Sequence, residues 1–473
     1  MHIIVNRLYL PRLNRSKVSS CLFHASFPWN KCKDLILEEI RIYSLEYRNG
    51  QKIYWDSLEK TRVVLPADRI KGIVLPSRGK TFHNMNISHA FSSPFGSDPL
   101  SICAKGSERI VLIVSDATRM VPTSDILPYV MDELISAGKK PGQVTAIVAT
   151  GVHRPATEEE MRQILGKWWG IIRIENHDPY NAERLVFIRK TALGTPVIVN
   201  RTVFESDFRI TIGKVEPHEF AGFSGGRKAV LPGISSESTI RINHSPDMIL
   251  HPKAKPGSLD GNPVHNDMLE AERSLGVDFS INILVEPDNR LSGVFCGHPE
   301  KSHQAAVDAW FENSRTVFSS RPEIVVTTPG SPLNMNLYQS LKPVVSLAPV
   351  MSPEGIIVLY SKCIEGIGSS DMPTPFEKTS GPEEVIANLR MNYRIQMDHS
   401  LLLAKIVAQG IKIFLVSPHI NPEITKSMLM TPFGTVQEAL DTAWKLKGTN
   451  AKILFFPCSQ RFLPTLEGDA NGS

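Results

Sequence analysis

Short apolar runs alternate with helical patterns along most of the chain, and this alternation limits the possible folds more than any other feature. RIVLIV (residues 109–114) and VTAIVAT (residues 144–150) are apolar runs of strand length. Between them, ILPYVMDELISAG (residues 126–138) has helical periodicity and ends in glycine. The second half repeats the pattern, with predicted strands at residues 323–328, 355–361, 411–417 and 451–457. Strands and helices that alternate in this way form βαβ units, so the sequence predicts an α/β fold with mainly parallel sheets flanked by helices.

The length of 473 residues exceeds what one hydrophobic core normally supports, so we expect two domains. Residues 252–267, rich in Pro, Gly and Asn, are the predicted linker. The predicted segments are a basic extension at 1–50, an N-terminal α/β domain at 51–275, a C-terminal α/β domain at 276–450, and a final strand with a tail at 451–473. That final strand could return to the N-terminal domain.

Composition and charge exclude several classes of protein. With 42% hydrophobic and 21% charged residues, the chain is neither disordered nor fibrous. A net charge of +4 without basic clusters argues against nucleic acid or an anionic membrane as a partner. No apolar run approaches the roughly 20 residues that span a bilayer. The six cysteines form no C-x-x-C pair, which argues against a zinc knuckle or a disulfide scaffold and favours a reducing cytoplasm.

The first part of the N-terminal extension is basic. Its first 33 residues contain six Lys and Arg side chains and no Asp or Glu. Asn6 and Arg7 interrupt its apolar stretch, so a secretory signal is not expected. We expect either a poorly ordered extension or a start site placed too far upstream.

Polar side chains directly follow two of the predicted strands. SDATR (residues 115–119) comes after the first strand and TGVHR (residues 150–154) after the second. Ligands of parallel sheets bind beyond the carboxyl ends of the strands, so Asp116, Arg119 and His153 are candidates for a site. Each has a simpler interpretation as well: Asp116 as a turn cap, Arg119 as the partner of a surface acid, and His153 as a histidine satisfied at the end of a strand.

Residues 218–233 (HEFAGFSGGRKAVLPG), which we call the glycine loop, follow the predicted strand DFRITIGKV. Glycines at this density indicate that the backbone approaches another group closely. The loop also carries His218, Arg227 and Lys228, and its amides suit an anion. It lacks the spacing of a Walker loop and of the dinucleotide-binding fingerprint. His244 follows near the end of a short helical stretch, where interaction with the helix dipole is the alternative to a role in a site.

Five segments together resemble one known family in order and in spacing. They are SDATR, ATGVHRPAT, PHEFAGFSGGRKAVLPGI, NHS and NLYQSLK (residues 336–342). On these motifs the chain is similar to the nickel-dependent lactate racemase family, from about residue 95 to residue 457. The resemblance implies two α/β domains with the active site in the cleft between them. It also implies a racemase or epimerase of a 2-hydroxy acid.

The resemblance further implies a cofactor and a set of site residues. Members of the family hold a nickel-pincer nucleotide, the nickel complex of pyridinium-3,5-bisthiocarboxylic acid mononucleotide. Lys228 would join it covalently, His244 would coordinate nickel, and His153 and His218 would be the acid/base pair. The remaining implied residues are Ser115, Asp116, Thr118, Gly225 and Gly226 for the cofactor, and Arg119, Tyr338, Gln339 and Lys342 for the substrate.

The implied chemistry agrees with these residue types. A 2-hydroxy acid does not easily lose its α-proton once its carboxylate is ionised, so removal and return of a hydride is the easier route to inversion, and it requires an electrophilic cofactor. Imidazole suits the accompanying transfer of the hydroxyl proton. The resemblance also implies a small-molecule 2-hydroxy acid as substrate, and proteins that synthesise the cofactor and insert nickel as partners. We expect a monomer or homodimer, in the cytoplasm as the cysteines indicate, and without nucleic acid or membrane as partners, as the charge and the short apolar runs indicate.

Two positions depart from the family pattern. Met120 stands where members often have proline, which would alter the stiffness of that loop. In YRIQMDHS (residues 393–400), Met397, Asp398 and His399 stand where lactate-specific members place a tryptophan, unless the alignment is shifted in this variable segment. A smaller and more polar lining suggests a substrate that is longer or more polar than lactate.

The other histidines receive no role in the site. His177 and His265 are expected to cap turns. His83 and His89 lie in a polar stretch without partners at ligand spacing.

Two functions of other classes stay open. A zinc-dependent hydrolase would use His153, His218 and His244 as zinc ligands, but it would leave the glycine loop and Lys228 without a purpose. A non-catalytic protein that binds a phosphate or nucleotide group would use the same loops, but phosphate binding needs no pair of histidines.

Overall fold

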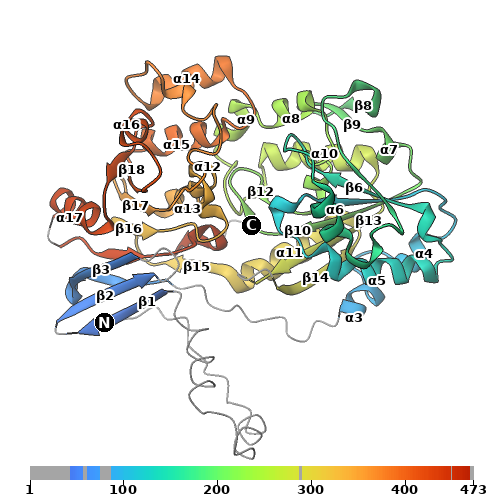
Figure 1. Cartoon of the computed structure of the whole chain (residues 1–473), viewed down its shortest axis with the longest axis horizontal. Helices are drawn as coiled ribbons and strands as arrows, with labels where there is room; N and C mark the ends of the chain where they lie inside the picture. Colours follow the sequence, from blue (N-terminus) through green and yellow to red (C-terminus); the bar gives the residue numbers. More distant parts are fainter. Residues whose placement is uncertain are drawn as a thin grey trace, which may run out of the picture. The chain divides into compact units, whose positions relative to one another are not determined.

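The chain forms two compact units, each assembled from separated segments (Figure 1). The computed structural model describes residues 43–48, 50–56, 61–74, 87–286, 290–448 and 450–468. Most of the predicted extension and His83 lie outside these ranges. Among the described residues, unit 1 comprises 43–74, 318–382 and 406–460, and unit 2 comprises 87–317, 383–405 and 461–468.

Unit 2 is built on a six-stranded sheet with the strand order β14-β13-β10-β5-β6-β7. All neighbouring strands are parallel except β13 and β14, which pair antiparallel. The strands are β5 (Ile110–Ser115), β6 (Val144–Ala149), β7 (Arg173–Asn176), β10 (Phe208–Lys214), β13 (Phe279–Val285) and β14 (Leu291–Gly297). The predicted strands at 109–114 and 144–150 are therefore confirmed, as is the strand that precedes the glycine loop.

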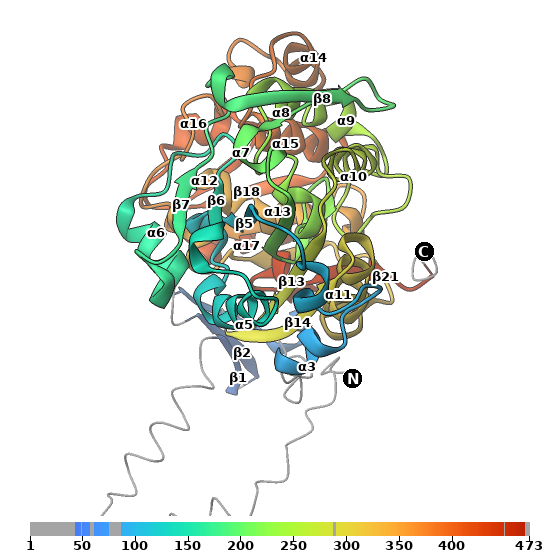
Figure 2. The ribbon, with the colours of Figure 1, turned by 90° about the vertical axis from the view of Figure 1, so that its right-hand side faces the viewer.

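Helices cover both faces of this sheet, because its central strands are apolar on both sides. On one face, Ile110, Leu112 and Val114 of β5 share a core with α5 and α6. On the other face, α11 packs against β13 and β14. Figure 2 views the strands with α5 and α6 on one side and α10 and α11 on the other. These helices are α5 (Thr123–Ser136), α6 (Glu158–Leu165), α10 (Pro263–Leu275) and α11 (Pro299–Ser314).

Shorter elements of unit 2 surround the glycine loop and the ends of the sheet. A small hairpin, β11 (Pro217–His218) with β12 (Gly222–Phe223), opens the glycine loop, and a 3-10 turn, η6 (Gly226–Ala229), follows. The other elements are α3 (Ile87–Ser92), α4 (Leu100–Cys103), α7 (Arg201–Phe204), α8 (Glu237–Asn243), α9 (Pro246–Leu250), α14 (Pro382–Asn392), α15 (Asp398–Ala408), and the strand pairs β8 (Leu185–Lys190) with β9 (Pro196–Asn200) and β15 (Arg315–Phe318) with β21 (Leu463–Leu466).

The predicted linker at residues 252–267 is wrong. The segment lies wholly inside unit 2, and Pro263 begins α10. Asn262 caps this helix, since its Oδ1 accepts from the backbone N–H of Val264 at 3.1 Å. An asparagine cap followed by proline in the first turn is typical of a helix start. Because Asn and Pro are also common in linkers, composition alone did not distinguish the two.

Unit 1 is built on a second six-stranded sheet, which is parallel throughout, in the order β19-β18-β17-β16-β20-β4. A three-stranded antiparallel sheet packs on it, with Tyr54 stacked on Phe455 at 4.1 Å between ring centroids. The strands are β1 (Tyr43–Arg48), β2 (Gln51–Asp56), β3 (Thr61–Pro66), β4 (Ile70–Ile73), β16 (Ile324–Thr327), β17 (Ile356–Tyr360), β18 (Lys412–Val416), β19 (Thr431–Phe433) and β20 (Ile453–Phe455). The helices of unit 1 are α12 (Leu337–Ser340), α13 (Lys342–Leu347), α16 (Pro422–Ser427) and α17 (Val436–Lys447).

The unit boundaries differ from the predicted segments 51–275, 276–450 and 451–473. Strand β4 pairs with β20, which puts the first described segment in unit 1, and β13 and β14 extend unit 2 to residue 317. The last predicted segment is divided, because β20 belongs to unit 1 and β21 pairs with β15 in unit 2. Apolar periodicity identifies a strand, but it does not identify the sheet that the strand joins.

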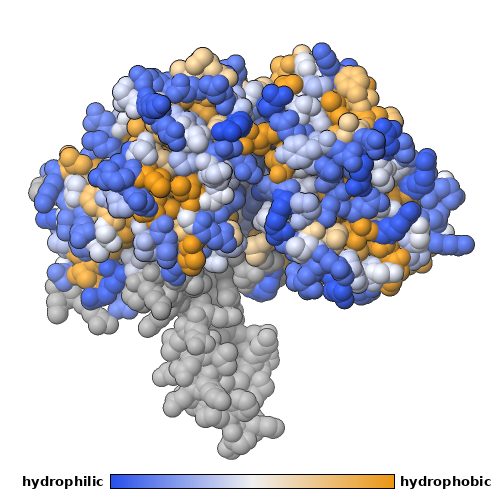
Figure 3. All heavy atoms as spheres, turned by 45° about the horizontal axis from the view of Figure 1, so that its top comes forward, coloured by the Kyte–Doolittle hydropathy of each residue, from blue (hydrophilic) through white to orange (hydrophobic). Residues whose placement is uncertain are grey.

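The surface is mostly polar on the face shown in Figure 3, where hydrophobic side chains gather only in small groups. Single exposed apolar side chains, such as that of Tyr180, are normal on folded proteins. None of the helices in the described ranges combines the length and hydrophobicity needed to cross a bilayer.

Buried Asp267 joins three segments of unit 2. Its Oδ1 accepts from Thr191 Oγ1 at 2.5 Å, and its Oδ2 accepts from Asn243 Nδ2 at 2.8 Å. Asn243 is the last residue of α8 and directly precedes His244. Asp267 therefore holds the end of the helix that directly precedes a predicted site residue, His244.

Replacing Asp267 should destabilise unit 2. In Asp267→Ala the Thr191 hydroxyl and the Asn243 amide lose a buried acceptor, and we expect the free energy of unfolding to fall by about 2–4 kcal/mol. Urea denaturation measures this change. Asp308→Ala, at an exposed position of α11, is the matched control and should change the free energy by less than about 0.5 kcal/mol. Equal losses in the two variants would contradict the role of Asp267.

Candidate active site

The carboxyl ends of three neighbouring strands bring the predicted site segments together. Strands β10, β5 and β6 are adjacent and parallel, so the loops that follow them leave the same edge of the sheet. Ser115 ends β5 and lies opposite Ala149, which ends β6. The glycine loop follows β10. This is the edge at which ligands of parallel sheets bind.

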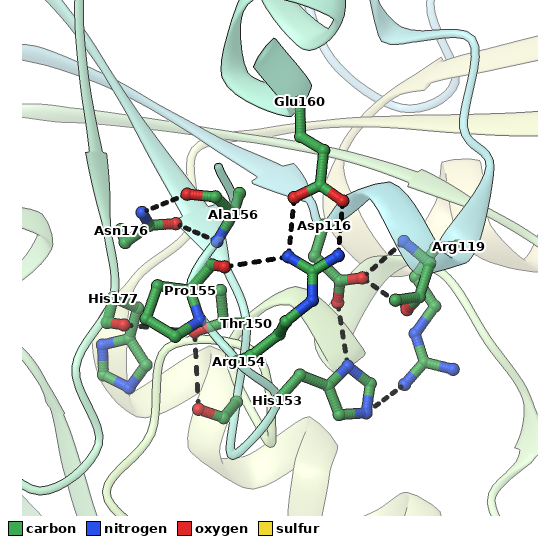
Figure 4. A network of polar contacts seen from close by, with 12 residues as sticks. Asp116, Arg119, Thr150, His153, Arg154, Pro155, Ala156, Glu160, Asn176 and His177 are labelled. Carbon is green, nitrogen blue, oxygen red and sulfur yellow. Dashed lines mark hydrogen bonds and ion pairs between the residues drawn. The ribbon is translucent and has the colours of Figure 1, made fainter. Parts of the chain in front are cut away.

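Asp116 is the centre of a network that joins the first two loops (Figure 4). It caps the 3-10 turn Ala117–Arg119, where its Oδ1 accepts from the Thr118 N–H at 2.8 Å and from the Thr118 hydroxyl. Its Oδ2 lies 3.1 Å from Nδ1 of His153. On the other side of the imidazole, Arg119 Nη2 lies 3.4 Å from His153 Nε2. The cap and the site candidate are thus the same side chain.

The ionisation of Asp116 determines the tautomer of His153. Burial raises the pKa of Asp116, but the hydrogen bond from His153 and the charge of Arg119 outweigh burial, and the pKa is lowered to about 2. An ionised carboxylate can only accept, so His153 Nδ1 carries a hydrogen and donates it. The lone pair of the neutral ring is therefore on Nε2, which faces Arg119. This is the arrangement of an oriented general base.

The neighbouring side chains support the β6 loop without entering this network. Arg154 forms a bidentate ion pair with Glu160 of α6, at 2.7 and 2.6 Å. His177 is buried, with Nε2 3.0 Å from the carbonyl oxygen of Ser235 and Nδ1 3.3 Å from Asn200 Nδ2. Burial lowers the pKa of His177 to about 4. The predicted role of His177 as a turn cap is therefore wrong, because its ring links buried segments of unit 2.

A second group of side chains lies in the glycine loop. His218 Nδ1 accepts from the backbone N–H of Ala221 at 3.3 Å, and its Nε2 lies 3.2 Å from Lys228 Nζ and 3.5 Å from Glu219 Oε2. Two residues that are ten positions apart are brought together because the hairpin β11–β12 folds the loop back on itself. His218 and Lys228 are therefore direct neighbours.

Phe220 connects this group to His244. Its ring contacts His218 edge-on at 4.8 Å between centroids and His244 edge-on at 5.0 Å. Burial lowers the pKa of His244 to about 3, and the charge of Lys228 contributes in the same direction. His244 is consequently a neutral imidazole, and its buried Nδ1 has no hydrogen-bond partner among the described residues. Phe220 was not predicted as a site residue, although it lies inside the HEF motif.

The charges of Arg119, in the network of Asp116, and of Lys228, in the glycine loop, both affect the pKa of His244. Arg119, like Lys228, lowers the pKa of His244, and Asp398 of α15 opposes them. Met397, Asp398 and His399 are all buried, and His399 Nδ1 lies 3.4 Å from Asp398 Oδ2. The segment that departs from the family pattern therefore acts electrostatically on the predicted nickel ligand.

The glycines of the loop are required by the protein's own packing. A Cβ on Gly225 would lie 2.5 Å from Val215 Cγ2, and one on Gly226 would lie 3.2 Å from the ring of His303. Both glycines have positive φ, 81° and 47°. We expected close approach to a ligand. The packing of Gly225 and Gly226 against Val215 and His303 is a separate reason for glycine at these positions.

The other residues discussed from the sequence lie outside the two groups around Asp116 and His218. Arg227 was expected to face an anion with His218 and Lys228, but it is buried, with an exposed fraction of 2%. His265 is not a turn cap, since it lies within α10. His89 is exposed on α3. The substrate candidates of the second half lie in unit 1, on α12 and α13: Tyr338, Gln339 and Lys342.

The three candidate zinc ligands do not form a metal-binding cluster. Among the described residues, no group of three or more His, Cys, Asp or Glu side chains is arranged to hold a metal ion. His153 bonds to Asp116, His218 lies against Lys228, and His244 is packed on Phe220.

Two family models match the chain over most of its length. The lactate racemase N-terminal domain matches residues 57–257, and the lactate racemase C-terminal domain matches residues 317–459.

Individual relatives agree with these matches. A lactate racemase of Thermoanaerobacterium thermosaccharolyticum is 32% identical over 83% of this chain and 94% of its own length. A lactate racemase of Lactiplantibacillus plantarum is 32% identical over 81% of this chain and 92% of its own length. The solved lactate racemase apoprotein from T. thermosaccharolyticum superimposes with a TM-score of 0.79 at 30% identity, covering 89% of this chain and 99% of that one. The chain therefore belongs to the lactate racemase family, and its class of activity is that of an isomerase.

Proposed function

We propose that the chain interconverts the enantiomers of a 2-hydroxy acid, with His153 and His218 as the acid/base pair. The observation that carries this proposal is the adjacency of Arg119 and His153. A guanidinium lies 3.4 Å from the basic nitrogen of an imidazole that Asp116 orients. Such a pair can bind an anion and accept a proton beside it.

The spacing of this pair suits a 2-hydroxy acid. Arg119 would hold the substrate carboxylate through its planar fork. The hydroxyl on the next carbon would then lie toward His153 Nε2, where the lone pair is. As hydride leaves the α-carbon, the hydroxyl proton passes to Nε2, and the ionised Asp116 stabilises the imidazolium that forms. His218 would exchange the corresponding proton for the other enantiomer. Tyr338, Gln339 and Lys342 of unit 1 are proposed to bind the substrate as well.

The residues present also fit a nickel-pincer nucleotide. His244 is a neutral imidazole with a buried ring nitrogen that has no hydrogen-bond partner among the described residues, and nickel favours such a nitrogen ligand. The amine of Lys228, which lies within the glycine loop, is proposed to join the cofactor. Ser115, Thr118, Gly225 and Gly226 are proposed to contact it. When bound, the cofactor would supply the acceptor for the hydride.

The segment at Met397, Asp398 and His399 supports a substrate other than lactate. Its acidic and imidazole side chains are buried in unit 2, and the charge of Asp398 acts on His244. A buried carboxylate favours a substrate that carries an additional hydrogen-bond donor. We therefore propose a 2-hydroxy acid that is longer or more polar than lactate as the substrate.

We further propose a cytoplasmic location, and proteins that synthesise the cofactor and insert nickel as partners.

The activity and the substrate can be tested together. Protein from cells that make the cofactor is incubated in H₂O with single enantiomers of lactate and of longer or hydroxylated 2-hydroxy acids, each deuterated at C2. We expect racemisation with the deuterium retained, and a higher kcat/KM for the polar acids. Replacement of the deuterium by solvent hydrogen would contradict hydride transfer. A preference for lactate would contradict the role of Asp398 and His399.

The orienting role of Asp116 predicts a specific kinetic defect. Asp116→Asn retains the shape but removes the charge that fixes the tautomer of His153, so kcat should fall by about 10²-fold, with KM changed far less. Steady-state kinetics measures both constants. Asp207→Asn is the matched control, since Asp207 bonds to Arg109 at the opposite, amino end of β5. Wild-type kcat in Asp116→Asn would contradict the mechanism.

Covalent attachment at Lys228 predicts an added mass. Intact-mass spectrometry of protein from a cofactor-producing host should show an adduct that is lost in Lys228→Ala and retained in Lys253→Ala, an exposed lysine of the same unit. Metal analysis should find nickel. Zinc in place of nickel would favour a hydrolase, and a protein with neither metal nor adduct would favour the binding protein.

A further inference from the structure

The glycine loop has a buried face that the proposed mechanism does not use. Arg227 is 2% exposed, and its guanidinium points into unit 2, away from solvent. Burial lowers the pKa of Arg227 to about 10, and the charge of buried Glu272 opposes this, so the guanidinium stays charged at neutral pH. A buried charge is costly unless it is paired or hydrogen-bonded, so the partners of this guanidinium matter.

The guanidinium binds the backbone of its own loop. Its Nη2 donates to the carbonyl oxygen of Ala221 at 2.9 Å and to that of Phe223 at 3.0 Å. These two carbonyls lie on either side of Gly222: Ala221 ends the turn between β11 and β12, and Phe223 is the last residue of β12. One planar group thus fixes the turn that folds the loop back on itself.

Side chains of β13 and α11 hold the loop from behind. Arg227 Nη1 lies 2.9 Å from Nε2 of His303, and that nitrogen is 2.8 Å from the carbonyl oxygen of Ser224. A neutral ring makes one of these two hydrogen bonds, either accepting from Arg227 or donating to Ser224. Burial lowers the pKa of His303 to about 3, so a neutral imidazole faces the guanidinium. Asn282 accepts from the Gly226 N–H at 3.0 Å and donates to Ser302 Oγ at 3.1 Å.

The same backbone carries the two groups on the other side of the loop. The carbonyl of Ala221 binds Arg227, and the N–H of Ala221 donates to Nδ1 of His218. Lys228 directly follows Arg227, and its Nζ lies 3.2 Å from His218 Nε2. A shift of the Arg227 guanidinium would therefore move two groups together: the Ala221 N–H that donates to His218, and the backbone of Lys228.

We propose that Arg227 is a positioning residue, which sets the geometry of His218 and Lys228 from behind the glycine loop. The inference rests on the proposed function for what these two side chains do. It assigns no contact between Arg227 and substrate or cofactor. Arg119 lies on a different loop, so the binding of the substrate carboxylate by Arg119 should be nearly independent of Arg227.

The test compares Arg227→Met, Arg227→Lys and the control Arg162→Met, which changes an exposed arginine of α6. In enzyme loaded with cofactor, Arg227→Met should lower kcat by about 10²-fold and leave KM within about threefold, because small displacements of reacting groups have effects of this size. Arg227→Lys should recover about tenfold, since an ammonium can donate to the carbonyls that Nη2 binds but lacks the second nitrogen that lies beside His303. Circular dichroism and thermal unfolding report the folded fraction.

A second measurement needs no cofactor. In the apoprotein, acetylation of Lys228 by limiting acetic anhydride is measured by peptide mass spectrometry relative to exposed Lys253. Arg227→Met should change this ratio by at least about threefold, and Arg162→Met should not change it. If Arg227→Met is too unstable to assay, the acetylation ratio of Lys228 to Lys253 is measured in Arg227→Lys instead, and it tests the same proposal.

The outcomes separate the two proposals. An unchanged Lys228 ratio in folded Arg227 variants, or kcat losses that only follow the loss of folded protein, would overturn the positioning role. Wild-type protein with neither adduct nor racemisation would overturn the proposed function, and the acetylation ratio would still decide the role of Arg227.

Discussion

The parallel pairing of β10, β5 and β6 is the constraint on which the candidate site depends. Parallel neighbours end at one edge, so three loops that are far apart in the sequence leave the sheet within reach of one another. The first loop contributes Asp116 and Arg119, the second contributes His153, and the third contributes His218 and Lys228. A change in the order of these strands would separate the network of Asp116 from the glycine loop.

Burial and charge act on the imidazoles in different ways. His153 is half-buried and keeps a defined tautomer because an ionised carboxylate holds one of its nitrogens. His244 is neutral because burial disfavours its protonated form, and cationic neighbours add to this. The first arrangement suits proton transfer and the second suits a metal ligand. Two side chains of one type are thus prepared for different chemistry by their surroundings alone.

The sequence was sufficient to predict the central strands and the motifs, but not which sheet each strand joins. Apolar runs such as that of β5 are read directly from the sequence, and a histidine or an aspartate after such a run points to the carboxyl edge. The direction of a side chain within a loop could not be read in this way. Arg227 looks like an anion-binding residue beside Lys228, but it turns inward because Ala221 and Phe223 offer it two carbonyls.

The remaining differences have similar causes. Gly225 and Gly226 are expected to contact a ligand, and the structure adds a reason for glycine that the sequence did not show, because Val215 and His303 exclude a larger side chain there. His177 appears in a turn-like sequence, but its ring is enclosed by segments from elsewhere in unit 2. Each difference depends on a contact between residues that are distant in the sequence, and local composition carries no information about such contacts.

The discontinuity of unit 2 has a consequence for its formation on the ribosome. Residues 87–317 emerge well before α14, α15 and β21, which complete the unit from later in the chain. The ion pair of Arg390 with Asp247 must therefore wait until residues 318–382 of unit 1 are translated, and the pairing of β15 with β21 must wait until all of unit 1 is translated. The nascent unit has an unpaired strand edge during this interval, a feature that invites wrong association. The environment of His244, to which Asp398 contributes, is thus completed only late in synthesis.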